Sequence, residues 1–164
     1  MNKKKITLTA ATFLAALGCY SSVDACTGFI IGKDLTTDGS TLYGRTEDLE
    51  PNHNKTFIVR AAKDHKKGDM WKDKANGFEY PLPDHSFKYT AVPDVTPERG
   101  VFDEAGFNEH GVSMSATVSA SANSKILKKD PYIKNGLAES SMASVILPSV
   151  KTAKEGVQLI AKNP

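Results

Sequence analysis

One cysteine, one arginine and one aspartate have the side chains that nucleophilic catalysis requires. Cys26 directly follows Val23-Asp24-Ala25 and begins a short apolar run, whereas Arg45 and Asp48 follow the next turn of the chain. A thiolate is a strong nucleophile, a nearby cation favours the thiolate over the thiol, and a carboxylate can hold an amine in place. The three side chains could therefore attack a carbonyl carbon through sulfur.

The first 25 residues have the composition of a secretory signal peptide. Three lysines form a basic head, an apolar run extends to Leu17, and Val23 and Ala25 are the small residues of a cleavage site before Cys26. The apolar run is shorter than the roughly 20 residues that a membrane span needs. We expect residues 1–25 to be removed, residues 26–164 to form the mature domain, and the protein to be secreted or held at the cell surface.

A lipid anchor is the competing interpretation of the same segment. Ala16-Leu17-Gly18-Cys19 resembles a lipoprotein cleavage box, in which lipid would be attached at Cys19, although the leucine is one position too close to the cysteine. Under this alternative the protein is a lipid-anchored surface binding module. N-terminal sequencing distinguishes it from an enzyme that begins at Cys26.

Cleavage before Cys26 would place a thiol and a free α-amine in one residue. Because the reference pKa of an α-amine is about 7.7–8.0 and that of a thiol about 8.5, the amine can accept the thiol proton near neutral pH. This is the N-terminal nucleophile arrangement. Arg45 would favour the thiolate and Asp48 would hold the amine, with Glu47 as the competing carboxylate. Spacing alone favours a simpler role for these charged side chains, a surface ion pair at a strand end.

Composition argues against several classes of partner. Taking the three lysines and one aspartate of the signal from 21 basic and 19 acidic residues leaves 18 of each, so the mature chain is nearly neutral. No basic stripe remains to bind a nucleic-acid backbone, and no later segment is apolar enough to span a membrane after processing. The four histidines lack the close helical spacing of a metal pair, so we expect no metal or other cofactor.

The pattern of apolar residues predicts strands first and helices afterwards. Apolar or alternating runs predict strands at residues 27–32, 40–45, 55–62, 87–92, 101–107 and 111–119. The turn at Asp38-Gly39 would fold the first two strands into a hairpin, which would bring residues 45–48 beside Cys26. We expect residues 64–83 to be a loop.

Two amphipathic helices are predicted after the strands. One covers residues 137–146, and the other begins at Thr152, where Thr152 and Glu155 resemble a capping box. Helices of this kind cover one face of a sheet, and no later strands are predicted to cover the other face. We therefore expect an incomplete domain.

Three segments, taken in order, resemble a known family. They are Cys26-Thr27 with its apolar strand, the run from Gly44 to Asp48 (GRTED), and the run from Asn108 to Thr117 (NEHGVSMSAT). The chain from Cys26 to about Lys162 is similar to the cysteine dipeptidase family of N-terminal nucleophile (Ntn) hydrolases, which are relatives of penicillin V acylase and bile salt hydrolase. The resemblance implies an α+β fold, a four-layer αββα sandwich, and hydrolysis of short peptides without a cofactor. It implies Cys26 as the nucleophile, Arg45 beside the thiolate and Asp48 on the α-amine.

The chain also departs from that family. Members are much longer, and their later part supplies an asparagine for the oxyanion hole and a further arginine. Because the loss of one oxyanion donor typically lowers the rate by about 10²–10³, we expect residues 26–164 alone to have little or no peptidase activity. An amide acylase of the penicillin V acylase or bile salt hydrolase type is the alternative within the same class. The sequence leaves open whether the chain forms a homo-oligomer. Asn108 is interpreted as a turn residue rather than a catalytic group.

Overall fold

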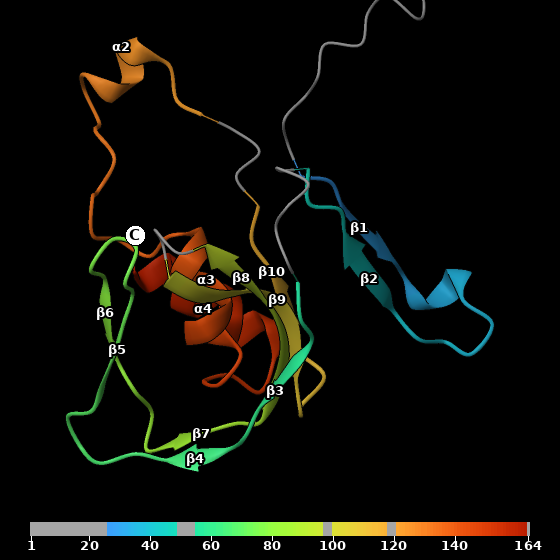
Figure 1. Ribbon diagram of the computed structural model, residues 1–164. Coiled ribbons are helices and arrows are strands. Elements are labelled where there is room, and N and C mark those ends of the chain that lie inside the picture. The colour runs from blue at the N-terminus through green and yellow to red at the C-terminus, as the bar shows by residue number, and fades with distance from the viewer. Residues whose placement is uncertain (1–25, 49–54, 97–99, 118–120, 164) are drawn as a thin grey trace, which may run out of the picture.

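The computed structural model describes residues 26–48, 55–96, 100–117 and 121–163. The expected signal peptide, its cleavage site and Cys19 lie outside the described residues. A four-stranded antiparallel sheet, in the order β10-β9-β8-β3, forms the centre of the structure (Figure 1). Its strands are β3 (Ile58–Arg60), β8 (Tyr89–Thr96), β9 (Gly100–Asn108) and β10 (Ser113–Ser115).

The central strands β8 and β9 lie unusually close together at Gly106. Tyr89 pairs with Asn108, and the register shifts between Val92 and Pro93. A Cβ atom at Gly106 would lie 1.9 Å from the carbonyl oxygen of Thr90, so only glycine fits there.

The hairpin that carries Cys26 is confirmed. Strand β1 (Gly28–Ile31) and strand β2 (Leu42–Arg45) are antiparallel, with Gly28 opposite Arg45. A short 3-10 helix (Lys33–Leu35) and a turn with Gly39 at φ 72° join them. Because that φ lies in the left-handed region, glycine suits the turn.

Residues 64–83 contain two short paired strands, so the expectation of a loop throughout this segment was wrong. Strands β5 (Met70–Lys72) and β6 (Glu79–Pro81) pair with each other, and β4 (Lys63–Asp64) pairs with β7 (His85–Ser86). The buried carboxylate of Asp73 accepts hydrogen bonds from Ala75 N and from the hydroxyls of Ser140 and Ser141. Hydrogen bonds such as those from Ser140 and Ser141 to Asp73 join residues far apart in the sequence. They leave no periodic pattern from which the strands could have been predicted.

The helices are α2 (Ser124–Leu127), α3 (Glu139–Ile146) and α4 (Ala153–Lys162). The capping interaction at Thr152 is confirmed, because its hydroxyl accepts a hydrogen bond from Glu155 N at 3.2 Å. The carboxylate of Glu155 accepts a hydrogen bond from Lys151 N at 2.7 Å. Among the helices in the described part of the chain, none has the length and apolar character that crossing a membrane requires.

Helix α3 packs against β9 and β10 and buries one face of the sheet (Figure 1). Two groups of buried side chains form the core: Tyr89, Ala91, Ala143 and Leu147, and Val112, Ile146 and Val150. Exposed apolar side chains lie on strands of the same sheet, with Val59 61% and Phe107 52% exposed. The fold is α+β as expected, whereas the four-layer sandwich and the truncation stay predictions.

Asn108 has the structural role that the sequence favoured. Its buried amide donates hydrogen bonds to the carbonyl oxygens of Leu147 (2.9 Å) and Val150 (2.7 Å). Its amide oxygen accepts hydrogen bonds from His110 N and Val112 N, each at 3.0 Å. Asn108 therefore joins the turn after β9 to the end of α3.

Candidate active site

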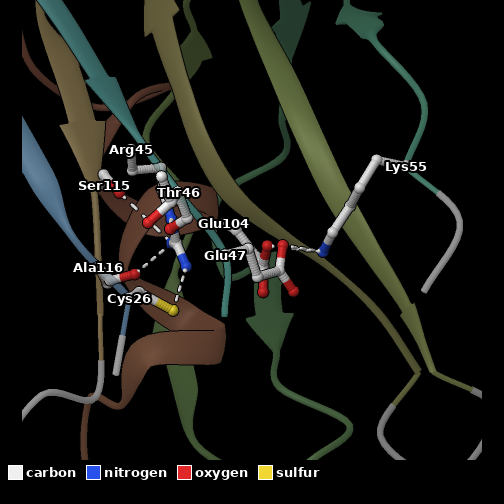
Figure 2. Close-up of polar contacts among 8 residues, drawn as sticks. All are labelled: Cys26, Arg45, Thr46, Glu47, Lys55, Glu104, Ser115 and Ala116. Atoms are coloured by element: carbon white, nitrogen blue, oxygen red, sulfur yellow. Dashed lines mark hydrogen bonds and ion pairs between the residues drawn. The ribbon is translucent and has the colours of Figure 1, made fainter. Parts of the chain in front are cut away.

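The thiol of Cys26 lies against the guanidinium of Arg45. Arg45 Nη2 donates a hydrogen bond to Cys26 Sγ at 3.2 Å (Figure 2). Arg45 Nη1 donates to the carbonyl oxygen of Ala116 at 2.6 Å and to Ser115 Oγ at 3.4 Å. The end of β10 thus holds the guanidinium in place while its other nitrogen contacts the sulfur.

The pairing of β1 with β2 brings this cation to the sulfur. Arg45 is the last residue of β2 and lies opposite Gly28, two residues after Cys26. Thr46 N donates to the carbonyl oxygen of Thr27 at 2.8 Å, which extends the pairing towards Cys26. A half-buried positive charge at this distance stabilises a thiolate more than a neutral thiol.

Asp48 is linked through Thr46 to Thr27, the residue after Cys26. Its carboxylate accepts a hydrogen bond from Thr46 Oγ1 at 3.4 Å, and Thr46 Oγ1 accepts one from Thr27 N at 3.1 Å. Within the described residues, no hydrogen bond joins Asp48 to Cys26. In the uncleaved chain the Cys26 nitrogen is a peptide N–H, so a contact between Asp48 and an α-amine stays a prediction.

Glu47 belongs to a second group of charges that sequence reasoning missed. Lys55 Nζ lies 2.6 Å from Glu47 Oε2 and 2.7 Å from Glu104 Oε2 (Figure 2). The side chains of Glu47 and Glu104 are 16% and 6% exposed. This Glu47–Lys55–Glu104 cluster joins the segment after β2 to the central strand β9. One sequence pattern could have indicated that Glu47 lies on the same side as Arg45. Side chains alternate along an extended chain, so residues 43, 45 and 47 share one face.

Burial controls the protonation of this cluster. The pKa of Glu104 is raised to about 7, chiefly by burial; the hydrogen bond from Lys55 offsets part of this rise, and a hydrogen bond with Glu47 contributes to it. Burial alone would lower the pKa of Lys55, but its hydrogen bonds to the two carboxylates raise it above its ordinary value. Lys55 therefore stays charged between the two carboxyl groups.

A cavity of about 350 Å³ lies between the hairpin and the central sheet, and it connects the two groups of charges. Its lining includes Tyr43, Arg45, Glu47, Lys55 and Glu104. Arg45 thus borders the cavity and also contacts the Cys26 sulfur. Among the described residues, no group of three or more His, Cys, Asp or Glu side chains is arranged to hold a metal ion.

A cysteine thiol fixed against an arginine, beside a cavity with further charged groups, is a site of the kind that cysteine hydrolases use. Comparison with known proteins identifies the family of the chain. The model of peptidase family C69 matches residues 25–162, and the chain belongs to that family. The resemblance to a dipeptidase family, inferred above from three short segments, is thereby confirmed.

Proteins described as dipeptidases are similar to this chain. "Probable dipeptidase B" of Streptococcus pyogenes serotype M18 (strain MGAS8232) is 73% identical over 162 residues, which cover 99% of this chain and 32% of that protein. "Probable dipeptidase" of Latilactobacillus sakei is 42% identical over 139 residues, or 84% of this chain and 29% of the relative. The chain therefore spans about a third of the length of the relatives it matches.

Proposed function

We propose that this chain is part of an exported cysteine-type dipeptidase that uses Cys26 as an N-terminal nucleophile. The observation that carries the proposal is the 3.2 Å contact between Arg45 Nη2 and Cys26 Sγ. Membership of peptidase family C69 and the dipeptidase names of the relatives support the reaction and the substrate class. Export and removal of residues 1–25 belong to the same proposal, because they would create the free α-amine.

In this scheme the α-amine of Cys26 accepts the thiol proton, and Arg45 stabilises the thiolate. The sulfur attacks the peptide carbonyl carbon, and the resulting tetrahedral intermediate collapses to a thioester. The protonated α-amine gives its proton to the departing amine of the second amino acid. Water then attacks the thioester, which releases the first amino acid and returns the proton to Cys26. Asp48 would hold the α-amine by a hydrogen bond.

The test uses a chimera in which this chain is joined, at the end of its matched region, to the remaining part of the S. pyogenes dipeptidase B. Without its first 25 residues, the chimera should hydrolyse dipeptides, and Cys26→Ala should abolish the activity. Cys26→Ser should retain only a weak remnant of the activity, because a hydroxyl is a weaker nucleophile at the same position. Full turnover by the Cys26→Ala chimera would refute the proposal. Cleavage of acyl amides but not of dipeptides would favour the acylase alternative.

A further inference from the structure

We propose that Glu47 and Glu104 bind the free α-ammonium group of the dipeptide, so that they select substrates with an unmodified amino terminus. This inference rests on the proposed function, because it assigns a substrate-binding role to the cavity next to Cys26. Three features of the cavity support this role: the position of the two carboxylates, the charge balance, and a buried hydroxyl that has no hydrogen-bond partner among the described residues.

The position follows from the covalent structure of a dipeptide. The α-ammonium nitrogen and the scissile carbonyl carbon are both bonded to the same Cα atom, which places them about 2.5 Å apart. A group that binds this ammonium must therefore lie near the nucleophile. The cavity lined by Glu47 and Glu104 is also lined by Arg45, which contacts Cys26 Sγ. Figure 2 draws the two carboxylates between Lys55 and the pair formed by Cys26 and Arg45.

The charges of the cavity favour a cation. Among the described residues that line it, the charged side chains are those of Arg45, Glu47, Lys55 and Glu104. Arg45 is directed to the sulfur, so its charge is balanced once Cys26 is a thiolate. Lys55 balances one of the two carboxylates, and near neutral pH the proton that Glu104 binds, because its pKa is raised to about 7, offsets the other. An ammonium ion that enters the cavity would take the place of this proton and neutralise the ionised carboxylate.

Tyr43 provides a separate indication that the cavity accepts a polar ligand. It lines the same cavity, and its hydroxyl is buried with no hydrogen-bond partner among the described residues. Buried hydroxyl groups are nearly always hydrogen-bonded. A dipeptide in the cavity would bring amine and carbonyl groups that can satisfy this hydroxyl.

A purely structural role for the Glu47–Lys55–Glu104 cluster makes a different prediction. If the cluster only joined the segment after β2 to β9, its loss would affect all substrates alike. If it binds the α-ammonium, the loss would affect only substrates that carry one. Comparing a dipeptide with its N-acetyl derivative separates the two roles, since acetylation removes the charge and leaves the scissile bond unchanged.

The experiment measures kcat/KM of the chimera for a dipeptide and for its N-acetyl derivative. The unmodified chimera should prefer the free dipeptide, and Glu104→Gln or Glu47→Gln should lower kcat/KM for it by about 10- to 100-fold, the range expected for a hydrogen bond to a charged group. The value for the N-acetyl derivative should stay within a few-fold. The matched control is Glu79→Gln, because Glu79 forms an exposed ion pair of the same 2.7 Å length with Lys72.

The possible failures are distinguishable. No dipeptide hydrolysis by the unmodified chimera would overturn the proposed function. Hydrolysis of both substrates with equal efficiency, or an equal loss for both in the two glutamine variants, would overturn only the ammonium site. Binding to the full chain gives an independent readout: a free dipeptide should slow alkylation of Cys26 by iodoacetamide, and Glu47→Gln should remove this protection. Equal protection by the N-acetyl derivative would also overturn the inference.

Discussion

The buried carboxyl group of Glu104 should make the stability of the fold depend on pH in an unusual direction. Its side chain is 6% exposed and lies 2.7 Å from Lys55 Nζ. Burial, partly offset by Lys55 and reinforced by Glu47, raises its pKa from 4.5 to about 7. The folded chain binds this proton more tightly than the unfolded chain does. The bound proton therefore stabilises the fold fully below pH 4.5, and this stabilisation is lost as the pH rises towards 7.

The size of the effect follows from the two pKa values. A difference of one pKa unit corresponds to about 1.4 kcal/mol, so the difference between 4.5 and about 7 corresponds to about 3 kcal/mol. Glu104→Gln replaces the carboxyl group by a neutral amide of the same shape, and this part of the pH dependence should disappear. A loss of about 3 kcal/mol is large compared with the roughly 5–15 kcal/mol that stabilises a typical domain.

Urea unfolding of the full chain at constant ionic strength, at pH values from 4 to 8, measures the effect. Between pH 4.5 and 7.5 the free energy of unfolding of the unmodified chain should fall by about 3 kcal/mol more than that of Glu104→Gln. Glu79→Gln, which alters an exposed ion pair, should follow the unmodified chain. Parallel pH profiles for the unmodified chain and Glu104→Gln would refute the account of the buried carboxyl group.

Three further predictions concern processing, packing and activity. Intact-mass measurement of the exported protein should give a chain that begins at Cys26; any retained residue would block the α-amine and refute the N-terminal nucleophile scheme. Asn108→Ala removes four hydrogen bonds and should lower the free energy of unfolding by about 3–4 kcal/mol in a thermal or urea melt, whereas Asn76→Ala removes two and should lower it by about half as much. Residues 26–164 alone should show little or no dipeptide hydrolysis, and co-expression with the remaining part of the S. pyogenes relative should restore it; full activity of the piece alone would contradict this.

Local patterns predicted the elements that carry the site. The Asp38-Gly39 turn and the apolar run after Cys26 predicted the β1–β2 hairpin, because both signals act between residues close in sequence. The cap at Thr152 was predictable for the same reason. The β5–β6 pair was missed, because its strands have three residues each and Asp73 anchors them through side chains far away in sequence.

The same distinction explains which site residues the sequence could find. Counting back from the turn placed Arg45 near Cys26, and their contact follows from a single pairing register. The choice between Glu47 and Asp48 could not be made by counting, because both lie beyond the last pair of the hairpin. It depends on Lys55 and Glu104, which reach Glu47 from the segment before β3 and from the central sheet.

Because side chains alternate along an extended chain, Glu47 and Asp48 lie on opposite sides and have different partners. Glu47 shares the face of Arg45 and turns into the cavity, where it meets Lys55, whereas Asp48 is exposed and is linked through Thr46 to the backbone of Thr27. If cleavage creates an α-amine at Cys26, this amine could bind the carboxylate of Asp48 without displacing an existing ion pair. The two carboxylates are therefore suited to two different amines, Asp48 to that of the protein and Glu47 to that of the substrate.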